Sequence, residues 1–219
     1  MRCPAAFAAL LFACLTQSTN VGTAKSWPDN FVGRLEILAL IEQLNGALLA
    51  SPSATTTLES WCADHHLASS VRLIAIPDKN ANVPASAADR LVLGVGPQEP
   101  VRYRRVALTC GSHVFSRAEN WYVPSRLTPQ MNRTLGTTDV PFGRVIRPLR
   151  PTRQTLSVER LWPPLPKNWD QIPPADAAPG PGIIGIPTDL FRHRAVVYDA
   201  RHRPIALVVE TYQDGILGL

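Results

Sequence analysis

Proline is unusually frequent in this chain, with 21 prolines among 219 residues. Proline has no backbone N–H and interrupts helices and central strands, so it concentrates in loops and connections. A helical bundle is therefore disfavoured, and we expect a strand-rich fold with long connections. The length and an apolar fraction of 45% are ordinary for one globular domain with a buried core.

Helical periodicity is strongest in the first part of the chain. Asn30 can cap a helix that begins near Phe31, whose apolar residues recur at three- and four-residue intervals: Leu35, Leu38, Ile41, Leu44 and Leu48. A break at residues 51–53 precedes a second helix, which we expect to open at Thr56 or Thr57 and to run to residue 67. Both apolar stripes indicate helix faces that pack on a core.

Strand patterns dominate the remainder of the chain. Short β-rich runs bounded by glycine or proline predict strands over residues 71–76, 101–110, 114–123, 150–161, 194–198 and 204–212. A further helix is expected over 125–135, and the short turns at 110–113 and 199–203 indicate hairpins. Helices at the front and hairpins behind predict an α+β fold with a single antiparallel sheet.

The N-terminus has the layout of a secretory signal. Arg2 precedes an apolar run over residues 5–15, and residues 22–24 form a cleavage site before Lys25. The run is too short to span a membrane. We expect residues 1–24 to be a signal peptide or targeting segment, residues 25–219 to form the domain, and the protein to be exported to the periplasm. A lipoprotein-like box ending at Cys14 offers a lipid anchor, whereas a misassigned start codon would leave the protein cytoplasmic.

Two cysteines, Cys62 and Cys110, remain after such cleavage. Two cysteines do not make a disulfide framework. They can pair in an oxidising compartment, or stay as buried thiols, which is the commoner state for cysteines in a core. The sequence leaves both states open.

Several functional classes lack their sequence signatures. The formal charge is +5, but the arginines are scattered, with no basic block, zinc finger or helix-turn-helix pattern, so nucleic acid is disfavoured as a partner. His65 and His66 are adjacent and would point to different faces of a helix, and no metal-ligand spacing exists. Residues 94–96 (Gly-Val-Gly) lack the third glycine of a dinucleotide motif. We expect no metal and no cofactor, and a small acidic ligand explains the arginines equally well.

Two charged residues stand out in predicted strands. Arg105 and its neighbour Arg104 occupy a strand of largely apolar residues, and period-two alternation requires one of the pair to point inward. A buried guanidinium needs an anion from the protein or a ligand. Glu210 follows an apolar run over residues 205–209, where an unpaired carboxylate is costly to bury. Both residues have an equally simple reading as solvent-exposed positions.

Four segments resemble, in order and approximate spacing, the pattern of the chorismate lyase family. They are residues 105–110 (Arg-Val-Ala-Leu-Thr-Cys), 118–124 (Ala-Glu-Asn-Trp-Tyr-Val-Pro), 138–144 (Thr-Asp-Val-Pro-Phe-Gly-Arg) and 203–210 (Arg-Pro-Ile-Ala-Leu-Val-Val-Glu). The resemblance covers roughly residues 58–215. The effector-binding domains of certain bacterial repressors share the family fold.

The resemblance implies a sheet of about six antiparallel strands with helices packed against it, and a ligand enclosed under two flaps. It implies conversion of chorismate to 4-hydroxybenzoate and pyruvate, a step of ubiquinone biosynthesis in bacteria, without metal or cofactor. Arg105 matches the arginine that binds the ring carboxylate, and Glu210 the glutamate at the hydroxyl or ether end. Phe142 matches an apolar pocket position that is usually leucine, and Leu67 lies near a flap. A protonated Glu210 would donate a hydrogen bond to the departing ether oxygen.

Two functions are carried forward. The first is a chorismate–pyruvate lyase, and the second is an exported, non-catalytic binding protein for a small aromatic or acidic ligand. The export signal and the proline-rich loop over residues 163–182, which replaces or extends a flap, favour the second. A transcriptional regulator is disfavoured because no DNA-binding domain precedes the pocket. We expect a monomer whose partner is a small aromatic or carboxylate ligand.

Overall fold

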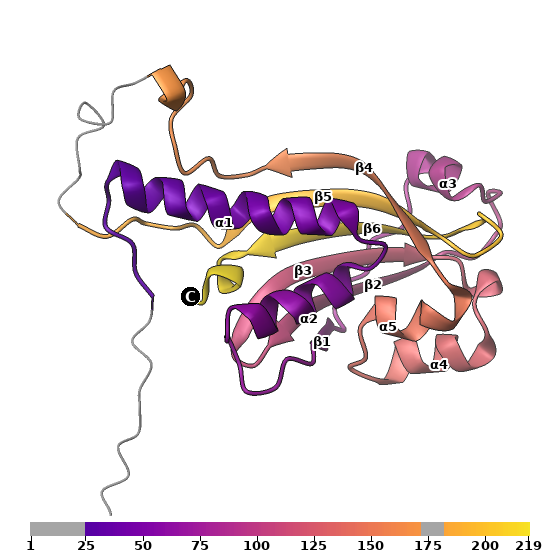
Figure 1. Ribbon diagram of the computed structural model, residues 1–219. Helices are drawn as coiled ribbons and strands as arrows, with labels where there is room; N and C mark the ends of the chain where they lie inside the picture. The colour runs from indigo at the N-terminus through magenta and orange to yellow at the C-terminus, as the bar shows by residue number, and fades with distance from the viewer. Residues whose placement is uncertain (1–24, 172–181) are drawn as a thin grey trace, which may run out of the picture.

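The chain folds around one antiparallel sheet. The computed structural model describes residues 25–171 and 182–219, so the expected targeting segment 1–24 and part of the loop 163–182 lie outside the described residues. The sheet has six strands in the order β1-β2-β3-β6-β5-β4, with helices packed on it (Figure 1). The predicted class, α+β with a single antiparallel sheet of about six strands, is confirmed.

The strands come in two groups that meet at β3 and β6. Their bounds are β1 Ile74–Asp78, β2 Arg102–Cys110, β3 His113–Tyr122, β4 Thr152–Arg160, β5 Asp189–Tyr198 and β6 Pro204–Gln213. The pairs β2–β3 and β5–β6 are hairpins, as the sequence predicted, and β6 pairs with β3 along Ser116–Tyr122. The last strand of the chain is therefore central in the sheet.

Strand β5 starts five residues before the strand predicted from the sequence. Its first half carries polar residues, which hid the strand pattern. Arg192 donates to Thr211 Oγ1 on β6 at 3.1 Å, and His193 lies fully buried in a polar cluster described below. Tertiary partners thus satisfy polar groups that looked unsuited to a buried strand.

The helices begin at side-chain caps. Their bounds are α1 Phe31–Ala50, α2 Ala54–Asp64, α3 Ala87–Leu93, α4 Pro129–Thr137 and α5 Phe142–Ile146. Asn30 caps α1 as predicted, by accepting a hydrogen bond from the Gly33 backbone N–H at 2.8 Å. Helix α2 starts earlier than predicted because Ser53 caps it. Helix α3 begins inside residues 80–89, which the sequence predicted as a loop, and Ser86 and Asp89 form its capping box.

Both faces of the sheet are covered. Helices α1 and α2 lie across one face, and α5 continues this layer beside α4 (Figure 1). The buried stripe of α1 (Ile37, Ile41, Leu44 and Leu48) and α2 packs against the strands in the main core. On the opposite face, Leu93 of α3 packs with Trp121 and Leu207. None of the helices in residues 25–171 and 182–219 has the length and apolar content needed to cross a bilayer.

A disulfide joins α2 to the sheet. Cys62 of α2 and Cys110 at the end of β2 are bonded, with their Cα atoms 6.5 Å apart, and neither residue is exposed. The sequence had left this pairing open. Because the bond closes a loop of 48 residues, it restrains α2 against the strand it covers.

Candidate ligand pocket

A cleft with two adjoining chambers opens between α2, α5 and the sheet. The inner chamber is lined by Pro52–Thr55, Val106, Leu108, Ala118, Asn120, Phe142, Gly143, Ile146, Pro151, Arg153, Val197, Val208 and Glu210. The outer chamber is lined by Pro52, Ser53, Thr55, Thr56, Glu59, Gly143, Arg144, Arg147, Arg150 and Pro151. The two chambers adjoin, because Ser53, Gly143 and Pro151 belong to both linings.

The inner chamber is narrow and apolar, with a volume of about 50 Å³. A single water needs roughly 10–15 Å³ on this measure, so the space suits the end of a ring-sized group. Its floor is formed by alternate residues of neighbouring strands that point to the same face, such as Val106, Ala118 and Val208. Helix α5 closes it with Phe142 and Ile146.

A buried ion pair supplies the charge in the inner chamber. Arg153 of β4 donates to Glu210 Oε2 of β6 at 2.8 Å, and the two side chains are 4% and 9% exposed. The hydroxyl of Tyr212 donates to the same oxygen at 3.1 Å. Charges this deeply buried persist only when they are paired, so the guanidinium and the carboxylate neutralise each other.

The pair belongs to a polar chain that reaches α1. His193 Nε2 donates to Asn45 Oδ1 of α1 at 2.8 Å, which leaves His193 Nδ1 to accept from Arg153 Nη2 at 3.4 Å. Four elements, α1, β4, β5 and β6, are therefore linked through consecutive hydrogen bonds from Asn45 to Tyr212. This chain fixes the position of Glu210 on the chamber wall.

Burial and the ion pair set the protonation states in this chain. Burial first, and then the Arg153 guanidinium, lower the pKa of His193 from 6.5 to about 4, so the imidazole is neutral at pH 7. Burial and the Glu210 charge raise the pKa of Tyr212 well above 10. Burial acts most strongly against the charge on Arg153, but the charge and hydrogen bond of Glu210 together with Tyr212 outweigh it, and the pKa of Arg153 is raised.

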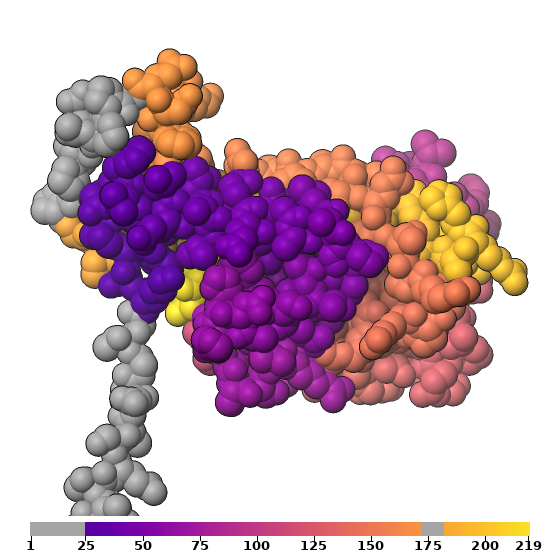
Figure 2. Space-filling view, in the orientation of Figure 1, coloured from indigo at the N-terminus to yellow at the C-terminus, as the bar shows by residue number. Residues whose placement is uncertain are grey.

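The outer chamber is larger and basic, with a volume of about 350 Å³. Arg144 forms an ion pair with Glu59 of α2. Arg147 and Arg150 are exposed, and among the described residues neither forms an ion pair. In Figure 2, the purple surface of α2 borders the orange surface of the segment that carries α5 and the start of β4.

The prediction that Arg105 shares a pocket with Glu210 is wrong. Arg105 points to the opposite side of the sheet, where it pairs with Asp78 at 3.4 Å and Glu119 at 3.3 Å and donates to the Tyr103 hydroxyl at 3.0 Å. Its side chain is 32% exposed and lies outside both chambers. Protein carboxylates already satisfy this guanidinium, so it has no need of a ligand anion.

Arg104, its neighbour, is the inward member of the pair. It is 7% exposed, lies opposite Asn120 in the β2–β3 ladder, and donates to the backbone oxygens of Thr138 and Val140 at 3.4 and 3.2 Å. Its Nε and Nη1 atoms are buried without partners among the described residues. Burial lowers the pKa of Arg104. The expectation that one of two adjacent arginines faces inward is confirmed, but the residue chosen was the wrong one.

Of the remaining predicted site residues, two line the inner chamber and one lies outside the cleft. Glu210 and Phe142 both lie on the inner chamber wall. Leu67 lies outside both chambers and packs instead against the main core, where it would meet a Cβ atom at Gly218. Within residues 25–171 and 182–219, no group of three or more His, Cys, Asp or Glu side chains is placed to hold a metal ion.

Arg153 and Asn45 are site residues that sequence reasoning missed. Arg153 sits in a strand that was predicted correctly, but its partner depends on the strand order β6-β5-β4, which the sequence does not display. Asn45 is a half-buried polar residue beside the buried Leu44 and Leu48 of α1. A polar residue next to an apolar helix stripe was the one available signal.

No protein-family model matches the chain. The chain is 40% identical over 202 residues to the uncharacterized protein y4mC of Sinorhizobium fredii, an alignment that covers 90% of this chain and 84% of the relative. The fold and the site together define the class of protein, which is an α+β domain with a ligand-sized cleft. The chain belongs to the same family as y4mC.

Solved structures with a similar arrangement include effector and ligand-binding domains. The effector domain of PhnF from Mycobacterium smegmatis is 17% identical, with a TM-score of 0.47, over 74% of this chain and 89% of that chain. PhnF from the same organism gives 16% identity and a TM-score of 0.48 over 87% of this chain and 89% of that chain. These likenesses are partial, so the function is argued below from the cleft itself.

Proposed function

We propose that the protein binds a small organic ligand with an apolar, ring-sized body in the two-chamber cleft. The observation that supports this most strongly is the inner chamber, where apolar walls surround an ion pair that is held in place from four elements. Ligand sites typically combine apolar walls with a few fixed polar groups in this way. Because Arg153 and Glu210 neutralise each other, an uncharged group such as a hydroxyl suits the inner end.

Calorimetric titration with 4-hydroxybenzoate, phenol and chorismate tests the proposal. Ala118→Phe places a ring in the inner chamber and should weaken binding at least about 10-fold, equivalent to about 1.4 kcal/mol. Ile146→Phe fills the same space from α5 and serves as an independent blocking variant. Arg105→Gln, which removes a charge outside the cleft, should leave the affinity within about 2-fold. Binding that survives both blocking variants, with the fold intact by circular dichroism, would refute the assignment of the cleft.

Chorismate lyase activity is a second candidate function. The positions of Glu210 and Phe142 on the chamber wall, with Arg104 on the same sheet face, favour it. The mechanism with a protonated Glu210 does not fit the ion pair, because a carboxylate bound to Arg153 accepts hydrogen bonds and donates none. Equal release of 4-hydroxybenzoate and pyruvate from chorismate would establish the lyase, whereas recovery of intact chorismate would leave binding as the function.

We propose further that the protein is exported. The disulfide between Cys62 and Cys110 supports this, because stable disulfides belong to oxidising compartments. Mass spectrometry of the purified mature protein should give an N-terminus at Lys25, or a lipid on Cys14, and no free thiol at residues 62 and 110. An unprocessed chain with both thiols free would place the protein in the cytoplasm.

A further inference from the structure

We propose that the outer chamber is a subsite for the anionic group of the ligand, with Arg147 and Arg150 as its binding residues. The ligand then lies with an uncharged polar end in the inner chamber and its carboxylate, sulfonate or phosphate at the outer arginines. This inference rests on the proposed function, because it assigns the charge and orientation of the ligand in that same cleft.

The inner chamber is unsuited to an anion. Its one guanidinium, Arg153, is already bound to Glu210 at 2.8 Å, and the two charges cancel. A second anion placed beside the pair would meet the Glu210 carboxylate at close range. Repulsion between like charges in a desolvated site is costly. An acidic ligand therefore has to keep its charge outside this chamber.

The outer chamber has the opposite charge balance. Arg144 is paired with Glu59, which leaves Arg147 and Arg150 without a carboxylate among the described residues. Arg147 is the first residue of a single 3-10 turn, Arg147–Leu149, and Arg150 directly follows it. The Arg150 N–H donates to the Arg147 carbonyl at 3.0 Å. Both guanidinium groups thus come from one short segment on one wall. Guanidinium groups bind planar or tetrahedral oxyanions through parallel hydrogen bonds.

The two chambers adjoin at Gly143, which lines both of them. A Cβ atom at this position would lie 2.7 Å from the Thr55 Oγ1 atom of α2, so glycine is what allows α5 to lie this close to α2. The inner space of about 50 Å³ admits only the end of a ring-sized group, and the adjoining outer space of about 350 Å³ has room for the rest of the ligand and its charged group.

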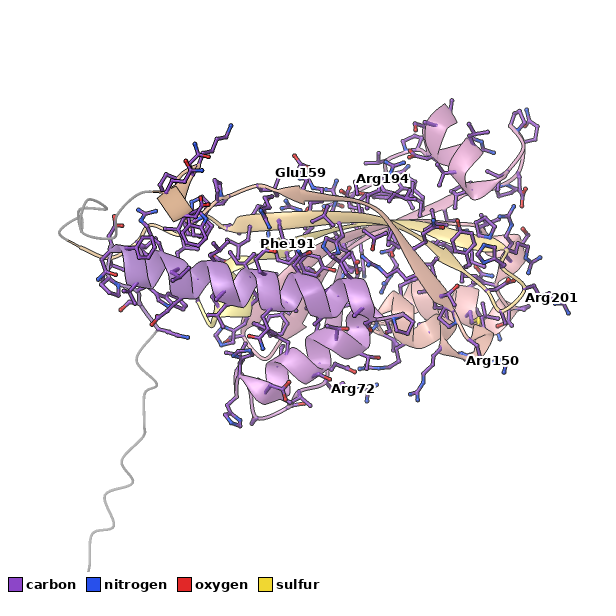
Figure 3. The ribbon with its side chains drawn as sticks, turned by 45° about the horizontal axis from the view of Figure 1, so that its top comes forward. Arg72, Arg150, Glu159, Phe191, Arg194 and Arg201 are labelled. Atoms are coloured by element: carbon purple, nitrogen blue, oxygen red, sulfur yellow. A yellow bond between two sulfur atoms is a disulfide. The ribbon has the colours of Figure 1, made fainter. Side chains whose placement is uncertain are left out.

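Arg150 has a backbone conformation that a non-glycine residue rarely adopts. Its φ of 48° and ψ of 60° are in the left-handed region, directly before Pro151. Glycine adopts this conformation without steric cost, and a residue before proline favours extended backbone instead. Figure 3 labels Arg150 where α5 leads into β4. Strain of this kind, kept at the wall of a cavity, fits a side chain that serves binding.

Two dyes with the same aromatic framework test the subsite directly. 8-Anilinonaphthalene-1-sulfonate has a sulfonate, and N-phenyl-1-naphthylamine lacks it. Both report burial by fluorescence, so the dissociation constant of each can be measured for the full chain. Arg147→Gln combined with Arg150→Gln should weaken the sulfonate dye at least about 10-fold, which is the effect of losing one or two charged hydrogen bonds. The neutral dye should change less than about 2-fold.

A matched control removes two charges elsewhere. Lys79 and Arg102 are exposed and lie outside both chambers, so Lys79→Gln with Arg102→Gln lowers the net charge equally. This variant should leave both dyes unchanged. Ala118→Phe and Ile146→Phe should displace both dyes, which locates them in the cleft.

The outcomes separate the two proposals. Dyes that are insensitive to Ala118→Phe and Ile146→Phe, or that do not bind, would overturn the proposed function and the subsite together. The blocking variants could displace both dyes while Arg147→Gln with Arg150→Gln fails to weaken the sulfonate dye more than the neutral dye. That result would overturn the anion subsite alone. An equal loss in the Lys79 and Arg102 control would show that the effect is net charge and would also overturn it.

Discussion

The inner and outer chambers of the cleft use arginine in opposite ways. In the inner chamber, Arg153 is 4% exposed and bound to a carboxylate, so its charge is cancelled. In the outer chamber, Arg147 and Arg150 are exposed, and no described carboxylate pairs with them. The inner arginine organises the protein, whereas the outer arginines remain available to a ligand.

Under the proposed function, this contrast would separate fit from charge recognition within one cleft. Burial makes the inner pair sensitive to any change, because an unpaired charge at 4% or 9% exposure is poorly solvated. Exposure makes the outer arginines tolerant of change in the free protein. Stability measurements should therefore respond to the inner chamber, and affinity for anions should respond to the outer chamber.

The largest stability effect is expected from breaking the inner pair. Arg153→Met leaves the Glu210 carboxylate buried and should lower the free energy of unfolding by about 3–5 kcal/mol. Combining it with Glu210→Gln removes the charge and keeps an acceptor for the Tyr212 hydroxyl, which should restore most of the loss. Urea denaturation measures both. Arg147→Met in the outer chamber should stay within about 0.5 kcal/mol of the native protein.

If Arg147→Met lowered the free energy of unfolding as much as Arg153→Met does, the contrast between the two chambers would be wrong. It would also be wrong if the double variant, Arg153→Met with Glu210→Gln, were no more stable than Arg153→Met alone, because the burial of an unpaired charge would then not be the cause.

Removing the disulfide should affect both chambers together. Helix α2, held by Cys62 and Cys110, contributes Ser53 and Thr55 at its start to both linings. Cys62→Ser with Cys110→Ser should lower the free energy of unfolding by about 2–4 kcal/mol. Affinities for the anionic and the neutral dye should fall in parallel. A selective loss of the anionic dye would show that α2 matters to the outer chamber only.

Acid should lower the free energy of unfolding by favouring protonation of His193, which belongs to the polar chain from Asn45 to Tyr212. The pKa of His193 is about 4 in the folded protein and near 6.5 when unfolded, so the unfolded chain binds the extra proton between these values. The stability contributed by neutral His193 is full above pH 6.5 and is lost as pH falls to 4, by about 3 kcal/mol. His193→Gln, compared with the native protein by denaturation from pH 7 to pH 4, should lose this part of the pH dependence. Identical pH profiles would contradict the assignment.

The smallest effect is expected at Arg150. Arg150→Gly relieves the left-handed backbone and should raise the free energy of unfolding by about 1 kcal/mol, while weakening the sulfonate dye several-fold. Arg147 has ordinary helical angles, so Arg147→Gly should instead lower stability by a similar amount. A more stable Arg150→Gly protein that binds the anionic dye normally would remove the functional reason for the strain.

The sequence predicted the class, the hairpins and Glu210 on a pocket wall, but it chose Arg105 instead of Arg104 as the inward-facing arginine of β2. The buried residues of β2, Val106 and Leu108, share the parity of Arg104, and Arg105 has the opposite parity. This signal was hidden because helices cover both faces of the sheet, so Tyr103 on the other face is also partly buried. Alternation of apolar and polar residues identifies the inward face of a strand reliably only when the opposite face is polar.

The partners of buried charges could not be predicted. Arg153 reaches Glu210 across 57 residues, and Asn45 reaches His193 across 148 residues. Such contacts depend on the order of strands and on which helix covers them, and no local pattern encodes either. Helix α3 was missed for a simpler reason, because its capping box at Ser86 and Asp89 lies inside a segment that was read as a loop.

Strand β6 follows the other five strands of the sheet in the chain, yet it occupies the middle of the sheet. Until residues 204–213 are synthesised, β3 presents an unpaired edge, and the walls of the inner chamber contributed by β2 and β3 face no opposing half. Exposed edges of this kind invite aggregation during folding. The cleft is thus completed only once β6 has joined the sheet, and a chain truncated before β6 would lack both the cleft and a central strand.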